Sequence, residues 1–137
     1  MVKYNPVWEK FGTQQEIKLL PIISKYFNEE IKHHTNKFDK FDYQSLTTNY
    51  ELKSRTNTYK KYPTTYLPKT KLYLLDNKKT IFIFNFLDGI YYIDYGENKD
   101  LIDNCYENTI TLTRGVNKGE RRVNKNIPIK FLKKLEQ

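Results

Sequence analysis

Glu51 and Lys53 stand two residues apart in the segment 49–55, whose sequence is NYELKSR. Its polar and apolar side chains alternate with a period of two, which predicts a β-strand. Because residues two apart on a strand point to the same face, Glu51 and Lys53 would be displayed together, while Tyr50 and Leu52 would face a core. An acid beside a lysine has the chemistry to hold a divalent cation and to stabilise negative charge that develops on phosphorus.

A second carboxylate lies upstream in the segment 38–44, FDKFDYQ, which is expected to pair with that strand as a β-hairpin. Asp39 and Asp42 are the two candidates. If the loop of the hairpin has four residues, Asp42 faces Glu51. If the loop has two residues, Asp42 faces Lys53. In either register, one acid of this segment comes close to the acid and the lysine of the next strand.

The hydrophobic pattern chooses between the two acids. With either loop length, Phe41 and Tyr43 share the apolar face of the hairpin with Tyr50. Placing Asp39 beside the glutamate would shift the register and turn Phe41 and Tyr43 onto the charged face, because a one-residue slip reverses the faces of a strand. The sequence therefore favours Asp42.

Two carboxylates that meet across a hairpin repel each other, and burial without a partner would raise the pKa of one of them. A divalent cation removes both costs. Mg²⁺ takes one or two carboxylates and completes its octahedron with water and phosphate oxygens, and a metal bound in this way activates water for attack on phosphorus. Lys53 would then orient the attacking water or stabilise the pentavalent phosphate.

Asp42, followed by Glu51-Leu52-Lys53 on the next strand, resembles the D…(D/E)xK core of the PD-(D/E)xK nucleases, which include restriction endonucleases, archaeal-type Holliday junction resolvases and phage exonucleases. Glu16, in a predicted first helix, is similar to the further acid that many members carry ahead of that core. The resemblance implies an α/β, restriction-endonuclease-like fold with a mixed central β-sheet flanked by helices. It also implies Mg²⁺, replaceable by Mn²⁺, held by Asp42, Glu51, the Leu52 carbonyl and Glu16, with Lys53 positioning the nucleophile and 5′-phosphate on the products.

The segments YELKSR, YKKYPTT, FNFLDGIYYIDY and IPI resemble, more narrowly, small nuclease-like proteins of large DNA viruses and phages. This resemblance implies a metal-dependent DNA endonuclease that acts on branched or viral DNA in the cytoplasm or nucleus of a host cell. The chain departs from the family pattern in three ways. Phe41 replaces the name-giving proline, the spacing from Asp42 to Glu51 is short, and no clear glutamine follows the lysine on the connecting helix.

Basic residues outnumber acidic residues by 24 to 16, which gives a net charge of +8. Such a surface attracts polyanions, mainly nucleic acid or an anionic membrane, and nucleic acid is the favoured partner here. The richness in lysine and the absence of alanine are also typical of an A/T-rich genome, which is an alternative origin for part of the charge. Arginine suits bidentate phosphate contact, and three of the four arginines lie in a glycine-containing basic loop. The candidate nucleic-acid contacts are Arg55, Lys60, Arg114, Arg121 and Arg122.

A chain of 137 residues is the size of one domain, here 1–137, with a nuclease-like core expected at about 13–95 and a basic extension at about 98–137. No apolar run reaches the roughly 18 residues that a membrane-spanning helix needs, and the first residues lack the apolar stretch of a signal peptide. The single cysteine, Cys105, excludes an internal disulfide and a cysteine-based zinc cluster. An intracellular protein is therefore expected.

The expected elements follow the chain in the order helix, strands, connector, strands and tail. A helix over 13–27 would begin at a capping box formed by Thr13 and Glu16 and would kink at Pro21. The remaining elements are a short strand at 30–34, a loop or the lead into a short helix at 56–70, a hairpin over 80–95 that turns at Asp88-Gly89, a short helix near 98–105 and a strand or helix from Ile127.

Two alternatives to a DNA endonuclease stay open. One is a nuclease-like protein that has lost catalysis and serves only as a nucleic-acid-binding or structural component. The other is an RNA endonuclease similar to the cap-snatching enzymes, which add a histidine to this fold. His33 or His34 would supply that histidine, since only one of two neighbours on a strand points inward. The form of the substrate and a homodimeric state also stay open.

Overall fold

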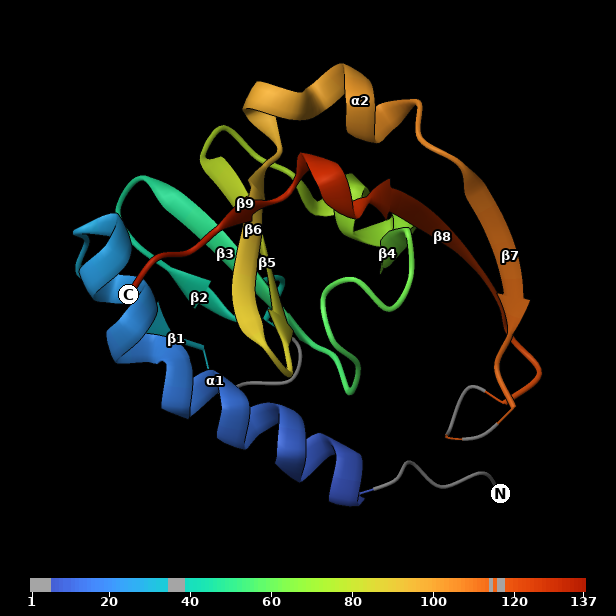
Figure 1. Ribbon diagram of the computed structural model, residues 1–137, viewed down its shortest axis with the longest axis horizontal. Helices are drawn as coiled ribbons and strands as arrows, with labels where there is room; N and C mark the ends of the chain where they lie inside the picture. Colours follow the sequence, from blue (N-terminus) through green and yellow to red (C-terminus); the bar gives the residue numbers. More distant parts are fainter. Residues whose placement is uncertain (1–5, 35–38, 114, 116–117) are drawn as a thin grey trace.

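The chain is a mixed α/β protein with a six-stranded mixed sheet and a three-stranded sheet, accompanied by helices (Figure 1). The computed structural model describes residues 6–34, 39–113, 115 and 118–137, with side chains from residue 10 onward. The elements are α1 (Pro6–Phe27), β1 (Lys32–His33), β2 (Tyr43–Gln44), β3 (Thr48–Ser54), β4 (Thr64–Pro68), η1 (Lys69–Leu74), β5 (Lys79–Phe86), β6 (Gly89–Asp94), η2 (Gly96–Asn98), α2 (Lys99–Asp103), β7 (Glu107–Thr111), β8 (Arg121–Pro128), η3 (Ile129–Phe131) and β9 (Lys133–Lys134).

The six-stranded sheet has the order β1-β2-β3-β5-β6-β9, and the three-stranded sheet has the order β4-β8-β7. Neighbouring strands are antiparallel except β3 and β5, which are parallel. A parallel pair needs a crossover, and here the chain between Arg55 and Lys78 builds β4 and the 3₁₀ helix η1 on its way. The resemblance to nucleases implies an α-helix in this crossover, and the described residues form none there.

Helix α1 begins at Pro6 and not at Thr13, so the predicted capping box lies inside the helix and does not cap it. Proline is favoured in the first turn, where its fixed φ suits the helix and its missing N–H is not needed. The helix also continues through Pro21, whose side chain is exposed. Leu19 and Ile23, one turn apart, are the buried positions through which α1 packs on the six-stranded sheet.

The central strands of the six-stranded sheet are buried on both faces, as is usual beside a parallel pair. On β5, Ile81 and Ile83 belong to the core under α1. Phe82 and Phe84 point the other way and pack in a second core with Leu67 of the three-stranded sheet. The two sheets are therefore joined through the face of β5 that α1 does not cover.

The stretch 56–70 contains strand β4, although a loop or the lead into a short helix was expected there. A short helix does follow, the 3₁₀ helix η1 from Lys69. Its prolines do not interrupt the ladder, because Pro63 precedes the strand and Pro68 is its last residue. Thr65 and Leu67 are buried, and Tyr66 between them is exposed. Similarly, the last long strand begins at Arg121 and not at Ile127, because its first half pairs with β7.

The hairpin of β5 and β6 is confirmed, but its turn lies one residue earlier than predicted. Phe86 pairs with Gly89, so Leu87 and Asp88 are the central residues. Asp88 Oδ1 accepts the N–H of Tyr59 at 2.8 Å, a contact between distant segments that no local pattern could reveal. The predicted short strand and short helix are present as β1 and α2. No helix among the described residues is long and apolar enough to cross a membrane.

Candidate functional site

Strands β2 and β3 pair in the register of a four-residue loop, with Tyr43 opposite Tyr50. Both tyrosines are fully buried, and Phe41 is 5% exposed, so the apolar face of the hairpin is the one that hydrophobic matching predicts. Continuing the same register brings Asp42 opposite Glu51. Of the two registers that the sequence left open, this is the one observed.

Asp42 completes the edge of β3 at the point where β2 stops. Its Oδ2 accepts the backbone N–H of Leu52 at 2.8 Å. Because the N–H and the C=O of one strand residue point to the same neighbour, the Leu52 carbonyl is directed to the same side of β3 as Asp42. The Asp42 carboxylate and the Leu52 carbonyl thus lie on the same edge of β3, just beyond the last residues of β3 that pair with β2.

Asp42 lies in an environment that resists its negative charge. Burial raises the pKa of its carboxyl group to about 8, with further contributions from the carboxylates of Glu51 and Glu16, while the Leu52 N–H opposes the shift. A carboxyl group with so high a pKa either keeps its proton at neutral pH or requires a nearby cation. The structure thus concentrates more acid at this point than it neutralises.

Glu51 is 2% exposed and carries two lysines on one carboxylate oxygen. Lys53 Nζ lies 3.2 Å from Glu51 Oε2, and Lys71 Nζ lies 2.9 Å from the same atom. The other oxygen, Oε1, is buried and has no hydrogen-bond partner among the described residues. A buried polar atom without a partner costs free energy, so this oxygen would be stabilised by a bound cation or by the proton of the Asp42 carboxyl group.

Lys71 is a site residue that sequence reasoning missed. It belongs to η1, in the crossover between β3 and β5, and it also donates to the Lys40 carbonyl at 2.9 Å. Its place in the chain, after a stretch read as a loop, gave no periodic pattern to mark it. Its ammonium reaches the site only because the crossover passes back over the face of β3 that carries Glu51.

Glu16 approaches from α1, and its Oε1 lies 3.0 Å from Nε2 of His33. His34 turns away: its Nδ1 lies 3.1 Å from the Phe41 carbonyl and 4.0 Å from Oδ2 of Asp39, which is exposed. Only one of the two histidines is therefore directed toward the acids, as expected for neighbours on a strand. Asp39 is exposed beside His34 and does not replace Asp42 beside Glu51.

The donor set of this site fits a hard divalent cation. Asp42, Glu51 and Glu16 offer carboxylate oxygens and Leu52 a carbonyl oxygen, the ligand type that Mg²⁺ prefers. Two observations favour a cation here, namely the unpartnered Oε1 of Glu51 and the raised pKa of the Asp42 carboxyl group. In the described part of the chain, no three acidic, histidine or cysteine side chains already form a metal cage. Water and phosphate oxygens would have to complete the shell, as is usual for Mg²⁺.

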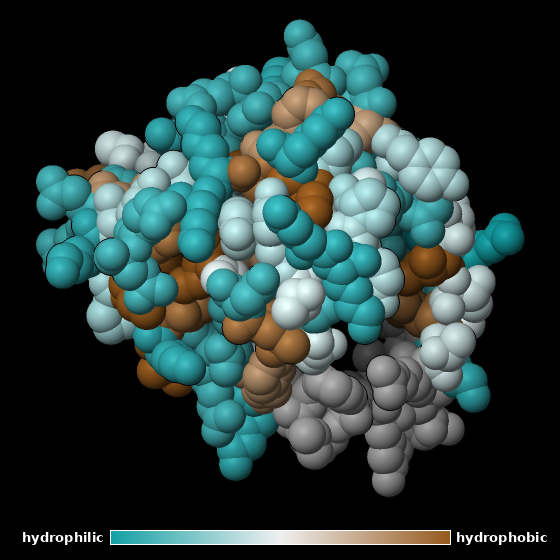
Figure 2. Space-filling view, in the orientation of Figure 1, coloured by the Kyte–Doolittle hydropathy of each residue, from teal (hydrophilic) through white to brown (hydrophobic). Residues whose placement is uncertain are grey.

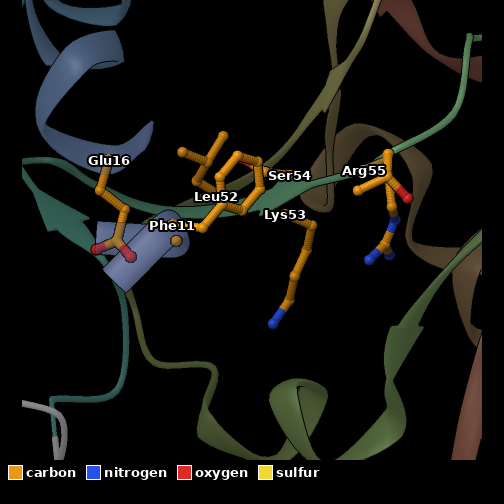
Figure 3. Close-up of a pocket in the computed structure, with 8 residues that line it drawn as sticks. Phe11, Glu16, Leu52, Lys53, Ser54 and Arg55 are labelled. Carbon is orange, nitrogen blue, oxygen red and sulfur yellow. The ribbon is translucent and has the colours of Figure 1, made fainter. Parts of the chain in front are cut away.

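A pocket of about 200 Å³ opens beside Lys53 (Figure 3). One wall comes from α1 and includes Phe11, Gly12 and Glu16, and the other is the end of β3 and the residues after it, 52–56. Figure 3 shows Lys53 and Arg55 extending in the same direction from β3, as residues two apart on a strand must. The pocket therefore shares Glu16 and Lys53 with the acidic site.

Arg55 is largely committed to the three-stranded sheet. Its guanidinium lies over the ring of Tyr66, with Cζ 4.2 Å from the ring centroid, and it donates to the Tyr66 carbonyl. Nε donates to Thr65 Oγ1 at 3.3 Å. Burial lowers the pKa of the Arg55 guanidinium. Arg55 therefore ties the end of β3 to β4 while it lines the pocket.

The other predicted nucleic-acid contacts are not gathered at the acidic site. Lys60 is exposed in the segment between β3 and β4. Arg121 and Arg122 begin strand β8, on the hairpin of β7 and β8 that extends away from β3 in Figure 1. Arg114 lies outside the described residues. Figure 2 shows hydrophilic residues over much of one face of the molecule, interrupted by smaller apolar areas.

Comparison of the chain with models of protein families, with curated proteins and with solved structures found no match.

Proposed function

We propose that this protein is a metal-dependent DNA endonuclease with a restriction-endonuclease-like arrangement of its six-stranded sheet. The observation that carries the proposal is the buried Glu51, which has one unpartnered oxygen and faces Asp42 across the hairpin. Two carboxylates, a backbone carbonyl and a lysine at the end of one hairpin match the acid–acid–lysine set of the PD-(D/E)xK nucleases. Mg²⁺, or Mn²⁺ in its place, would be held by Asp42, Glu51, the Leu52 carbonyl and Glu16.

Each residue then has a separate task. The bound metal supplies Lewis acidity and a water of lowered pKa. Asp42 and Glu51 would hold that cation, in competition with the proton of Asp42 and the two lysines on Glu51. Lys53 Nζ, 3.2 Å from Glu51 Oε2, is within reach of a phosphate at the same carboxylate, where it orients the attacking water and stabilises the charge that develops on phosphorus. The products would carry a 5′-phosphate, as the resemblance implies.

The first test is the calorimetric titration of Mn²⁺ into the wild-type chain and into Glu51→Ala. Glu107→Gln is the matched control, because Glu107 also carries two lysines, Lys69 at 3.1 Å and Lys125 at 2.7 Å, but lies on β7. Cleavage is then measured with Mn²⁺ on linear duplex, branched and single-stranded DNA. Binding and cleavage that are lost in Glu51→Ala and kept in Glu107→Gln support the proposal.

Two other results would change the assignment. Nucleic-acid binding without Mn²⁺ binding or cleavage would favour the inactive nuclease-like protein, which acts only by binding or as a structural component. Cleavage whose products report paired cuts on both strands, together with a doubled mass in light scattering, would assign a homodimer.

One contact favours a second candidate, an RNA endonuclease similar to the cap-snatching enzymes. His33 Nε2 lies 3.0 Å from Glu16 Oε1, so a histidine stands at the edge of the acidic site. In that case His33→Ala should weaken Mn²⁺ binding and abolish RNA cleavage, while His34→Ala should do neither. Equal activity of both variants on DNA would leave the DNA endonuclease as the better description.

A further inference from the structure

We propose that the pocket beside Lys53 binds one unpaired nucleotide of the substrate strand, next to the phosphate that is cleaved. This inference rests on the proposed function and names the form of its substrate. Glu16 and Lys53 belong both to the acidic site and to the wall of the pocket, so a strand whose phosphate lies at Glu51 leads directly into it. A space of about 200 Å³ has room for one base.

The pocket is open because β3 extends beyond the end of the neighbouring strand β2. Strand β2 pairs with β3 only as far as Tyr50, and the Asp42 carboxylate then takes the N–H of Leu52. Backbone groups of Leu52 and Ser54 point to that same side, since alternate residues of a strand direct their N–H and C=O groups alike. Among the described residues no further strand covers this edge, so the pocket has polar backbone groups along one wall.

The opposite wall supplies an aromatic ring. Phe11 is partly exposed and lines the pocket from α1. In Figure 3 its ring is seen face on, with Glu16 on one side and Lys53 on the other. Nucleic-acid bases stack on such rings regardless of their identity. Lys53 lies toward the other end, where its ammonium suits a phosphate that flanks the stacked base.

Gly12 is the feature of α1 that the helix itself does not explain. Glycine is one of the poorest helix formers, and apart from its two chain neighbours and the nearby backbone of the helix, no described atom lies within 4 Å of the place that a Cβ at this residue would take. Packing therefore does not require glycine here. What a larger residue would do at position 12 is occupy the pocket, so the glycine keeps the space beside Phe11 open.

A pocket for one base restricts the substrate. A base can enter it only from a single strand, a flap, a frayed end or a junction, or after it has left the duplex at the cost of unpairing. The protein should therefore prefer unpaired over fully paired DNA at the cleaved position.

The experiment measures binding in EDTA, so that neither metal binding nor cleavage contributes. Fluorescence anisotropy is recorded for the full chain with a labelled single-stranded oligonucleotide and with a blunt hairpin duplex. The variants are Phe11→Leu, which removes the ring, and Gly12→Leu, which fills the pocket. The control is Tyr106→Leu, which removes a ring that is 72% exposed elsewhere. Thermal unfolding checks that each variant is folded.

Phe11→Leu and Gly12→Leu should each weaken single-strand binding by roughly five- to tenfold, the low end of the contribution of one stacked base. Duplex binding by these two variants and both kinds of binding by Tyr106→Leu should be unchanged. Unchanged single-strand binding in both variants, or an equal loss for duplex and single strand, would overturn the pocket assignment. The proposed function fails by a different result, the absence of Mn²⁺-dependent cleavage, so the two failures are distinguishable.

Discussion

The ammonium of Lys71 lies 2.9 Å from Glu51 Oε2, the carboxylate oxygen that Lys53 also contacts at 3.2 Å. Two positive charges therefore stand on the single acid that is most deeply buried in the candidate site, where a divalent cation is proposed to bind. An ammonium on a metal ligand both stabilises the ligand and competes with the metal for it. The occupancy of this site by a metal should therefore depend on both lysines.

Replacing Lys71 by methionine should destabilise the protein in EDTA, because a buried acid loses one of its two partners, a loss of about 1–3 kcal/mol. The same change should raise the affinity for Mn²⁺ several-fold, since the competing charge is gone. Thermal unfolding in EDTA and calorimetry with Mn²⁺ measure the two effects. Lys69→Met is the control, because Lys69 also lies on η1 but pairs with Glu107. A fall in Mn²⁺ affinity in Lys71→Met would show that Lys71 assists the metal and does not compete with it.

Lys53→Ala should abolish cleavage without weakening Mn²⁺ binding, because a lysine is not a metal ligand and its task is to act on water and phosphate. This task of Lys53 is the one proposed above, and single-turnover cleavage and calorimetry on the same preparation separate the two properties. If Mn²⁺ binding were lost with Lys53, the metal would have to sit elsewhere than at Asp42 and Glu51.

The raised pKa of Asp42 predicts a pH dependence of stability in EDTA. The folded chain holds this proton up to a pKa of about 8, whereas an unfolded aspartate releases it near a pKa of about 4. The stabilising contribution of the protonated carboxyl group is thus complete below about pH 4 and is lost as the pH rises toward 8. Asp42→Asn cannot titrate, so its stability should fall less than that of the wild type between pH 5 and pH 8.5.

Urea unfolding at the two pH values measures this difference, with Asp39→Asn as the control, because Asp39 is exposed in the same segment. Parallel pH profiles for the wild type and Asp42→Asn would mean that the carboxyl group of Asp42 ionises normally.

Arg121 and Arg122 should contribute unequally to DNA binding, because neighbours on a strand point to opposite faces. Arg122 lies on the same face of β8 as Asn126. Asn126 pairs with Tyr66 of β4, and the guanidinium of Arg55 lies over the ring of Tyr66. Arg122 is therefore on the face of this sheet that also carries Arg55. Each lost phosphate contact lowers the slope of log affinity against log salt by about one. Arg122→Ala should lower the slope by this amount, and Arg121→Ala should lower it less. Equal slopes for both variants and the wild type would remove β8 from the nucleic-acid surface.

The pairing of β2 with β3 shows what the sequence could reveal. Phe41, Tyr43 and Tyr50 alternate with polar residues, and their burial alone decides that Asp42 and not Asp39 faces Glu51. The hairpin of β5 and β6 and helix α2 were readable for the same reason, because local patterns determine them.

The contacts made by Lys71 and Arg55 show what the sequence could not reveal. Both depend on where the crossover after β3 returns, and that path is fixed by the pairing of β4 with β8 near the other end of the chain. The start of α1 was also misplaced, because Thr13 and Glu16 fit a capping box equally well inside a helix and at its beginning. Local signals have no means of ranking such alternatives.

The detour of the crossover through β4 has a consequence for the order in which the molecule assembles. Thr64 of β4 pairs with Pro128 of β8, so this ladder closes a loop that spans nearly half the chain, and contacts of such high sequence separation form slowly. The hairpin with Asp42 and Glu51 is local and can form early, whereas Lys71 follows directly after β4 and reaches Glu51 only when that strand is docked. During synthesis the two acids would thus meet long before the second lysine arrives, and a divalent cation in the cell would meet a more accessible, less neutralised site in the nascent chain than in the finished fold.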